Sequence, residues 1–165
     1  MKRILLTLAA LGTALTMQAK VVLPGIFGDN MVLQQQSEAQ FWGKAAPGKK
    51  VTIRPSWSTQ GITANVGKDG RWRAAVPTPE AGGPYTIELS DGERLTLRDV
   101  LIGEVWLCSG QSNMEMRVAD RVLNYEQEMK EADAYGNIRL LHIDNTTSPV
   151  PLGEASVRHG GWQGG

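Results

Sequence analysis

The stretch that decides the fold of the first half of the chain is "DGRWRAAVPTPEAGGPYTIELSDG", residues 69–92. Apolar and polar residues alternate in it twice, from Trp72 to Val76 and again from Tyr85 to Leu89. Successive side chains of a strand point to opposite faces of its sheet, so this alternation predicts two strands with one buried face each. The pattern is interrupted by turn-forming residues, namely Lys68-Asp69-Gly70, Ala81-Gly82-Gly83-Pro84 and Ser90-Asp91-Gly92.

The same period of two extends over residues 20–98. Val51 and Ile53, for example, lie on either side of the polar Thr52, and Ala46-Pro47-Gly48 marks another turn before them. Short alternating strands with a turn after each one are typical of antiparallel sheets packed face to face. We therefore predict a β-sandwich domain of six or seven strands over residues 20–98.

After residue 98 the apolar pattern changes. A near-continuous apolar run covers residues 105–108, and a second covers residues 138–143. Strands covered on both faces read as continuous apolar runs, so both runs are predicted to be buried strands. Between them, residues spaced four, three, four and three apart share one face of a predicted helix: Val118, Val122, Tyr125, Met129 and Ala132. The order strand, helix, strand predicts a parallel sheet, so we expect residues 99–165 to form the incomplete first part of an α/β domain.

Residues 1–19 differ from the rest of the chain. Lys2 and Arg3 precede an apolar run from Ile4 to Leu15, and Ala19 is a small residue suited to cleavage. At ~1.5 Å per residue this run is too short to cross about 30 Å of hydrocarbon. It indicates a secretory signal peptide removed after Ala19, and hence a secreted or periplasmic protein with no membrane association after cleavage.

Composition excludes several classes of protein. Lys plus Arg and Asp plus Glu both total 17, and the charges are dispersed, so no basic surface for nucleic acid is expected. Cys108 is the only cysteine, so the chain has no intrachain disulfide. Cys108 also lies far from the signal peptide, which excludes a lipoprotein anchor there. We expect Cys108 to be a small core residue at the end of the first buried strand.

Ser112 is the candidate nucleophile. It lies in "VWLCSGQSNMEM", residues 105–116, just past the carboxyl end of the predicted strand, where parallel sheets gather reactive groups. Gly110 permits a sharp turn, and a following helix can direct N–H groups at a developing oxyanion. The pattern is not the G-x-S-x-G of α/β-hydrolases. From these residues alone, a plain turn with a helix cap over Gly110, Gln111, Ser112 and Asn113 is the alternative.

The chain resembles the sialate O-acetylesterase family of the SGNH hydrolases over nearly all of residues 20–143. The most specific match is "GEVWLCSGQSNMEM", residues 103–116. Other matching segments are "LPGIFGDNMVLQQ" at 23–35, "FWGKAAPGKKVTI" at 41–53, residues 69–92 and "LRDVLIGEVWL" at 97–107. The resemblance implies a three-layer α/β/α hydrolase domain beside the sandwich. It also implies removal of acetyl groups from sugar hydroxyls through an acyl-enzyme, with no metal and no organic cofactor.

Carried over residue by residue, the resemblance makes Ser112 the nucleophile and its own N–H an oxyanion donor, with Gly110, Gln111 and Asn113 supporting the turn. Ser109 is the competing nucleophile, which the family pattern disfavours. The Asp-x-x-His that supplies the base in this family is absent, because Arg139 stands three residues before His142 and Ser156 three before His159. We therefore expect a catalytically incomplete piece of a longer esterase.

The expected substrate is an O-acetylated sugar or glycan, with sialate favoured. The alternatives are an acetylxylan-type deacetylase of plant polysaccharide and a secreted sugar-binding module without catalysis. The exposed aromatic that such a module needs is best supplied by Trp57, whereas Trp72 is expected in the core. Asn145-Thr146-Thr147 is a glycosylation sequon of the kind that often arises by chance.

Overall fold

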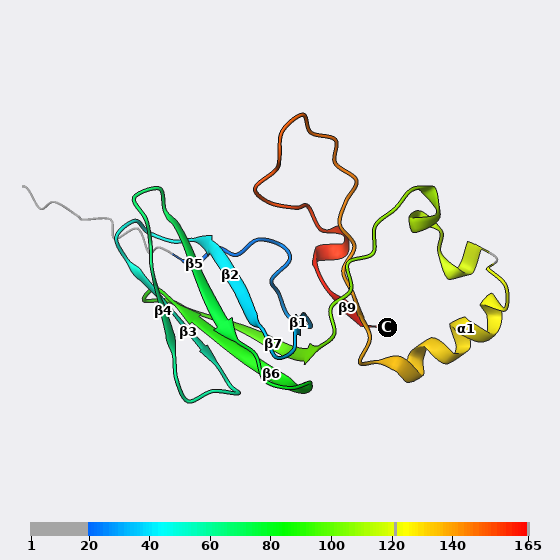
Figure 1. The fold of residues 1–165 in the computed structure, drawn as a ribbon, viewed down its shortest axis with the longest axis horizontal. Coiled ribbons are helices and arrows are strands. Elements are labelled where there is room, and N and C mark those ends of the chain that lie inside the picture. The colour runs from blue at the N-terminus through cyan, green and yellow to red at the C-terminus, as the bar shows by residue number, and fades with distance from the viewer. Residues whose placement is uncertain (1–19, 121, 165) are drawn as a thin grey trace, which may run out of the picture.

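The computed structural model describes residues 20–120 and 122–164, drawn as a ribbon in Figure 1. The predicted signal peptide lies outside the described residues. Seven strands occupy the first part of the chain. They are β1 (Val32–Gln34), β2 (Glu38–Lys44), β3 (Lys50–Pro55), β4 (Ile62–Asn65), β5 (Arg71–Pro77), β6 (Gly82–Ser90) and β7 (Arg94–Gly103).

These strands form two sheets. One has five strands in the order β1-β7-β6-β3-β4, and the other pairs β2 with β5. All the pairs are antiparallel except β1 with β7, which run parallel with Gln34 opposite Gly103. A parallel pair needs a long connection, and here that connection contains β2 to β6. The ends of β1 and β7 therefore meet although they are far apart in the sequence.

Side chains of both sheets form one core. Ile53 and Leu89 are paired across β3 and β6, Phe41 lies on β2, and all three are fully buried. The predicted alternation is confirmed, because the inward residues of β3, β5 and β6 are buried and their neighbours are half-buried or exposed. Burial of such a side chain contributes about 1.5–3 kcal/mol, so this core is the main source of stability. Trp72 is buried in it, as predicted.

Three of the predicted turns lie between strands, but Gly82-Gly83-Pro84 does not: these residues belong to the start of β6, where the pairing with β7 shifts register between Gly82 and Tyr85. Gly70, between β4 and β5, has φ +77°, a conformation that residues with a Cβ rarely adopt, and its N–H donates to the Gly67 carbonyl at 3.0 Å. Strand β7 crosses the expected domain change after residue 98, and Val100 and Ile102 belong to the core. The β-rich region, residues 20–103, is therefore longer than the alternation alone indicated.

The apolar run at residues 105–108 does not form the predicted buried strand. These residues have no regular secondary structure, and the side chains of Trp106 and Leu107 are 82% and 91% exposed. Cys108 is exposed too, so its prediction as a core residue is wrong for this structure. A strand requires a neighbour for its N–H and C=O groups, and within the described residues no strand pairs with this run.

The single predicted helix is replaced by shorter pieces: η2 (Val118–Asp120), α1 (Tyr125–Glu131) and η3 (Ala132–Tyr135). Asn124, just before α1, has φ +61°, which interrupts any continuous helix there. Val118, Val122 and Met129 on the predicted apolar face are all exposed. Most helical stability in proteins comes from packing an apolar face, and nothing in the described chain covers this one.

The apolar run at residues 138–143 contains a short strand, β8 (Arg139–Leu140). It pairs with β9 (Gln163–Gly164), and the pair is antiparallel, so the predicted parallel sheet with a crossover helix is wrong for the described residues. Figure 1 shows the chain after β7 running away from the β-rich region to α1 at the far end and then returning, so that β9 lies between the two. No helix of the described part is long and apolar enough to cross a membrane.

Candidate active site

Ser112 begins a short 3-10 helix, η1 (Ser112–Glu115). Gln111 before it is not helical, with φ −114° and ψ −148°. The turn is closed by two backbone hydrogen bonds, from the Met114 N–H to the Gln111 carbonyl at 2.9 Å and from the Met116 N–H to the Asn113 carbonyl at 3.3 Å. Ser112 is exposed. The serine thus sits at an accessible change of chain direction, as an attacking hydroxyl requires.

Gly110 serves this turn differently from the expectation. It is not among the glycines with positive φ, so it does not supply a left-handed turn. A Cβ at Gly110 would instead lie 2.9 Å from the Met114 Cγ atom. The absence of a side chain therefore leaves room for Met114 to fold back over the turn.

The other two predicted residues contribute through the main chain. Gln111 and Asn113 accept the two turn hydrogen bonds with their carbonyl groups. The first N–H groups of a helical turn have no partner within it, so those of Ser112 and Asn113 are the natural donors to an oxyanion.

Neither histidine is joined to Ser112 within the described residues, where the Ser112 hydroxyl has no hydrogen-bond partner. His142 is exposed, and its carbonyl accepts the Arg158 N–H at 2.8 Å. His159 lies in η4 (Arg158–Gly160) with φ +55°. A serine hydroxyl becomes a strong nucleophile when a neighbouring base takes its proton. The described residues therefore present an exposed candidate serine at a turn, with no base hydrogen-bonded to it.

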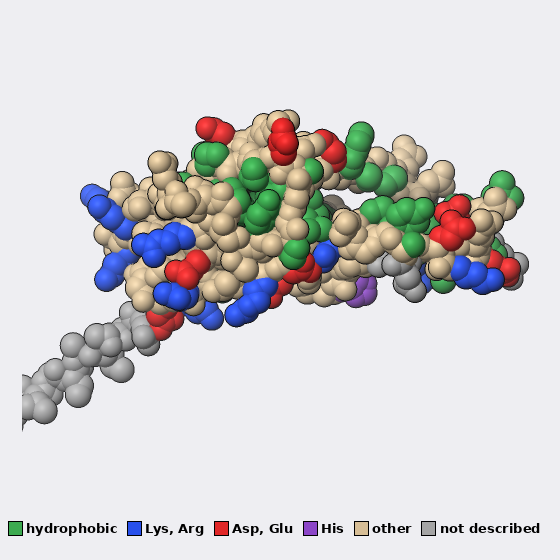
Figure 2. All heavy atoms as spheres, turned by 90° about the horizontal axis from the view of Figure 1, so that it is seen from below, with side chains coloured by type: hydrophobic (Ala, Val, Ile, Leu, Met, Phe, Trp, Pro, Cys, Tyr) green, Lys and Arg blue, Asp and Glu red, His purple; other side chains and the backbone are tan. Residues whose placement is uncertain are grey.

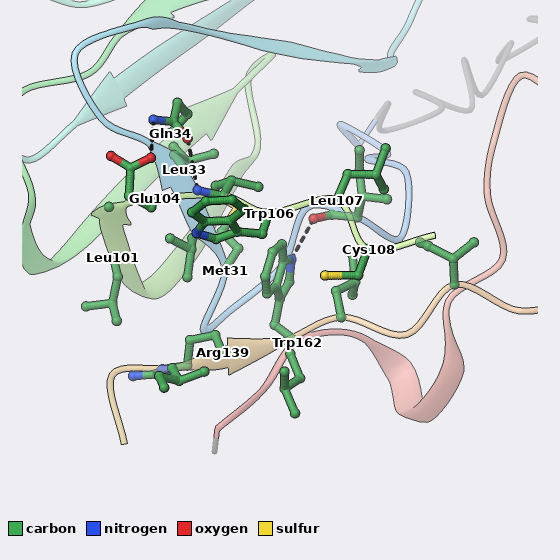
Figure 3. Close-up of a pocket in the computed structure, with 18 of the residues that line it drawn as sticks. Met31, Leu33, Gln34, Leu101, Glu104, Trp106, Leu107, Cys108, Arg139 and Trp162 are labelled. Carbon is green, nitrogen blue, oxygen red and sulfur yellow. Dashed lines mark hydrogen bonds between the residues drawn. The ribbon is translucent and has the colours of Figure 1, made fainter. Parts of the chain in front are cut away.

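Ser112 lines an open hollow between the β-rich region and the rest of the chain. Met31, Leu33 and Leu101 contribute apolar side chains from the β-rich side, and Figure 3 shows Trp106 and Trp162 among the lining residues. The indole N–H of Trp162 donates to the Ile26 carbonyl at 2.9 Å. Figure 2 shows hydrophobic side chains exposed along the middle and the narrower end of the molecule. The hollow that Ser112 lines therefore has an apolar side, which the β-rich region supplies.

The aromatic residue considered for sugar stacking is engaged elsewhere. Trp57 is half-buried, its indole N–H donates to the Pro77 carbonyl at 2.9 Å, and its ring meets Tyr85 edge-on with centroids 5.3 Å apart. Trp57 therefore packs against the β-rich core, and its prediction as a surface residue is wrong. Asn145 of the sequon donates its side-chain amide to the Glu115 carboxylate, which links the region after β8 to η1.

A hydrogen-bonded network that the sequence analysis missed lies at the start of the segment leading to Ser112. The side-chain amides of Gln34 and Gln35 donate to the two carboxylate oxygens of Glu104, at 3.1 and 2.6 Å. These two hydrogen bonds, the shorter from Gln35 first, hold the pKa of Glu104 below its ordinary value. The only hint in the sequence is that all three residues belong to the segments that resemble the esterase family.

A second anionic group lies beside His142. The Asp144 carboxylate accepts hydrogen bonds from the Ser156 hydroxyl at 2.8 Å and from the Arg158 guanidinium at 3.1 Å. These contacts, chiefly the one from Ser156, lower the pKa of Asp144. They tie the strand-like residues after β8 to the C-terminal part of the described chain. Among residues 20–120 and 122–164, no group of three or more His, Cys, Asp or Glu side chains is placed to hold a metal ion.

Comparisons with known proteins agree on one family, although no family model matches the chain. The sialate O-acetylesterase of Rattus norvegicus is 34% identical over 134 residues, which are 75% of this chain and 24% of the rat protein. The human sialate O-acetylesterase is 34% identical over 125 residues, which are 70% of this chain and 24% of the human protein.

A solved structure shows the same relationship in three dimensions. The crystal structure of a carbohydrate acetylesterase from Xanthomonas citri superposes with a TM-score of 0.79 at 29% identity, over 88% of this chain and 32% of that one. The chain spans about a quarter of the length of the sialate O-acetylesterases that it matches. Similarity of sequence and of structure over most of its residues leads to one conclusion: the chain belongs to the sialate O-acetylesterase family.

Proposed function

We propose that the protein is a carbohydrate O-acetylesterase, which hydrolyses acetyl esters on sugar hydroxyls, with O-acetylated sialate as the favoured substrate. The observation that carries the proposal is the 34% identity to sialate O-acetylesterases over 134 residues, which include the turn at Ser112. A solved carbohydrate acetylesterase of similar structure supports the same class of substrate. The name carbohydrate acetylesterase specifies no particular sugar. An acetylated plant polysaccharide is therefore the second candidate substrate.

In the proposed reaction the Ser112 Oγ atom attacks the carbonyl carbon of the acetyl group. The hydroxyl proton passes to a base, and the N–H groups of Ser112 and Asn113 stabilise the negative charge on the acetyl oxygen. The sugar oxygen then leaves and takes up the proton, so that an acetyl ester of Ser112 remains. Water hydrolyses this ester and releases acetate and free Ser112. No metal or organic cofactor takes part.

The proposal extends to the architecture and the location of the protein. In this proposal residues 20–103 form a β-sandwich domain, and the residues after 103 form the first part of an SGNH-type α/β domain whose further residues complete the site. The cationic and apolar composition of residues 1–19 supports export to the periplasm or the medium.

Covalent labelling tests the nucleophile. A protein that contains this chain together with the rest of the proposed α/β domain, which supplies the base, is incubated with a serine-reactive fluorophosphonate, and the modified residue is identified by mass spectrometry of its peptides. We expect modification of Ser112, its loss in Ser112→Ala, and its retention in Ser109→Ala, the matched control three residues away. Labelling at Ser109, or labelling that persists in Ser112→Ala, would show that residues 110–113 form only a turn.

Acetate release tests the reaction. Wild type and Ser112→Ala are compared on O-acetylated sialic acid and on acetylated xylan. Since Ser112 has no hydrogen-bonded base in the described residues, we expect the chain alone to be slow. In a comparable serine hydrolase, loss of the base lowers kcat by about 10⁶. Turnover at rates typical of enzymes would contradict the interpretation that the base is missing.

A further inference from the structure

We propose that Glu104 is a positioning residue, whose ionised carboxylate, held by Gln34 and Gln35, sets the direction in which the chain leaves β7 toward Ser112. The inference rests on the proposed function in one respect, namely that Ser112 is the residue whose position matters for catalysis. The position of the segment itself can be measured without any activity.

The parallel pairing of β1 and β7 creates the site. Gln34 lies opposite Gly103, and the Gln35 N–H donates to the Gly103 carbonyl at 2.8 Å, so the two strands end side by side. Glu104 is the first residue past this paired edge. Its carboxylate lies where the side chains of Gln34 and Gln35 reach it, as Figure 3 shows for Gln34 and Glu104.

In both glutamines the side-chain amide donates a hydrogen bond through its NH₂ group and accepts one through its Oε1 atom. While their NH₂ groups donate to Glu104, the Gln34 Oε1 atom accepts the Val105 N–H at 2.9 Å and the Gln35 Oε1 atom accepts the Ala81 N–H at 2.9 Å. The network therefore joins the end of β1, the loop before β6 and the first two residues after β7. Val105 is the residue through which the network holds the segment that continues to Ser112.

The ionised state of Glu104 is what orients both amides. A carboxylate accepts hydrogen bonds at both oxygens, so each NH₂ group turns toward it and each amide oxygen turns toward a backbone N–H. A protonated acid, or a glutamine at position 104, presents a donor to one of these NH₂ groups and breaks that arrangement. Since the hydrogen bonds share the same two amides, losing one weakens the others.

Glu104 is the one charged group that orients the Gln34 and Gln35 amides among the described residues. No charged side chain of the described residues lies within salt-bridge distance of Glu104, and the groups that face it are the two amides. The hydrogen-bonded environment also favours the charged form, in line with its lowered pKa. Residues 105–111 have no strand or helix in this structure, so their direction depends on how the segment begins.

A distance measurement tests the proposal. Cys108 is the only cysteine, is exposed, and lies four residues after Glu104, so it takes a spin label without further change. A second label is placed at Lys68→Cys, an exposed turn position of the β-rich region. Double electron–electron resonance then gives the distribution of distances between the two labels. We expect one narrow distance at pH 7, a broad distribution in Glu104→Ala and Glu104→Gln, and no change in the matched control Glu93→Gln.

Two further measurements make the outcome decisive. Wild type should lose its narrow distance when the pH falls below the pKa of Glu104, whereas Glu104→Gln should be broad at every pH. Gln34→Ala removes the hydrogen bonds of Gln34 to Glu104 and Val105 and should broaden the distance distribution as Glu104→Ala does. If circular dichroism shows that one of the two variants does not fold, the other still tests the proposal. A distance that stays narrow in Glu104→Gln and Gln34→Ala, or that is broad in wild type at pH 7, overturns the proposal. Failure of Ser112 to react with the fluorophosphonate would contradict the proposed function and leave these distances as they are.

Discussion

The β-rich region, residues 20–103, and the segment from 104 to 164 carry similar apolar residues with opposite results. Leu89 in β6 is fully buried, whereas Leu107 is 91% exposed. In the first region every alternating strand has a neighbouring strand and an opposite sheet to pack against. In the second, the apolar runs have the composition of buried elements but nothing in the described chain covers them. The comparison shows that an apolar pattern becomes structure only where a partner surface is present.

Hydrogen exchange should show the largest difference between the two regions. Amides that are hydrogen-bonded within β3, β6 and β7 should exchange only through global unfolding, whereas amides of residues 106–120 and 122–131 open locally at little cost. If the β-rich region has a stability of at least about 5 kcal/mol, the two sets of protection factors differ by about 10³-fold or more. Equal protection of the two regions, measured by mass spectrometry or NMR, would break the comparison.

Two leucine substitutions, one in each region, compare the regions by the change in the free energy of unfolding. Leu89→Ala removes a fully buried side chain and should cost about 3–5 kcal/mol, from lost burial and the cavity left behind. Leu107→Ala makes the same chemical change on an exposed side chain and should stay within about 0.5 kcal/mol. Both values come from urea unfolding followed by circular dichroism. A large cost at Leu107 would show that it is packed in solution.

Two glycines sharpen the comparison at the level of the backbone. A Cβ at Gly43 would overlap the Val22 carbonyl oxygen and lie 3.2 Å from the Trp72 ring, so Gly43→Ala should cost about 1–3 kcal/mol. A Cβ at Gly110 meets only the Met114 side chain, which is flexible and exposed. Gly110→Ala should therefore cost less than about 1 kcal/mol in the same unfolding experiment. The reverse order of the two costs would contradict the packing described for Gly43.

The smallest expected effect is the dependence of the C-terminal part on pH. The folded pKa of Asp144 lies below its unfolded value, which is about 3.9. The carboxylate therefore stabilises the contacts with Ser156 and Arg158 above about pH 4, and this contribution is lost as the pH falls through the folded pKa. NMR protection factors of the Asp144 and Arg158 amides should fall on acidification. In Asp144→Asn the protection factors should be low already at neutral pH and should not change with pH. If the variant shows the same fall in protection on acidification as the wild type, the Asp144 carboxylate is not the cause.

Much of the β-rich region was predictable because its signals are local. The alternation from Trp72 to Val76 and that from Tyr85 to Leu89 depend only on the geometry of a strand. Both segments are strands, and their inward faces are the predicted ones. The pairing of β1 with β7 was not predictable in this way. Its residues are about seventy positions apart in the sequence, and no periodicity records which strands will become neighbours.

The candidate site divides in the same manner. Glycine and polar residues after an apolar run indicated a turn at Ser112, and the structure has one, a 3-10 helix beginning at that residue. The predicted buried strand before it and the helix after it were wrong here, since both predictions assumed a covering partner. The network of Gln34, Gln35 and Glu104 was missed because two neutral amides and one acid far apart in sequence carry no joint signal.

The sequence by itself determined the alternating strands, their turns, the inward residues of the core and the likeness to sialate O-acetylesterases. Each of these depends on residues a few positions apart or on the order of residues along the chain. Only the tertiary structure decided that β1 lies parallel to β7, that β7 continues to Gly103, and that Glu104 meets two glutamine amides at this edge. The physical reason is that hydrogen bonds between distant segments form only once the burial of a shared core has brought their backbones together.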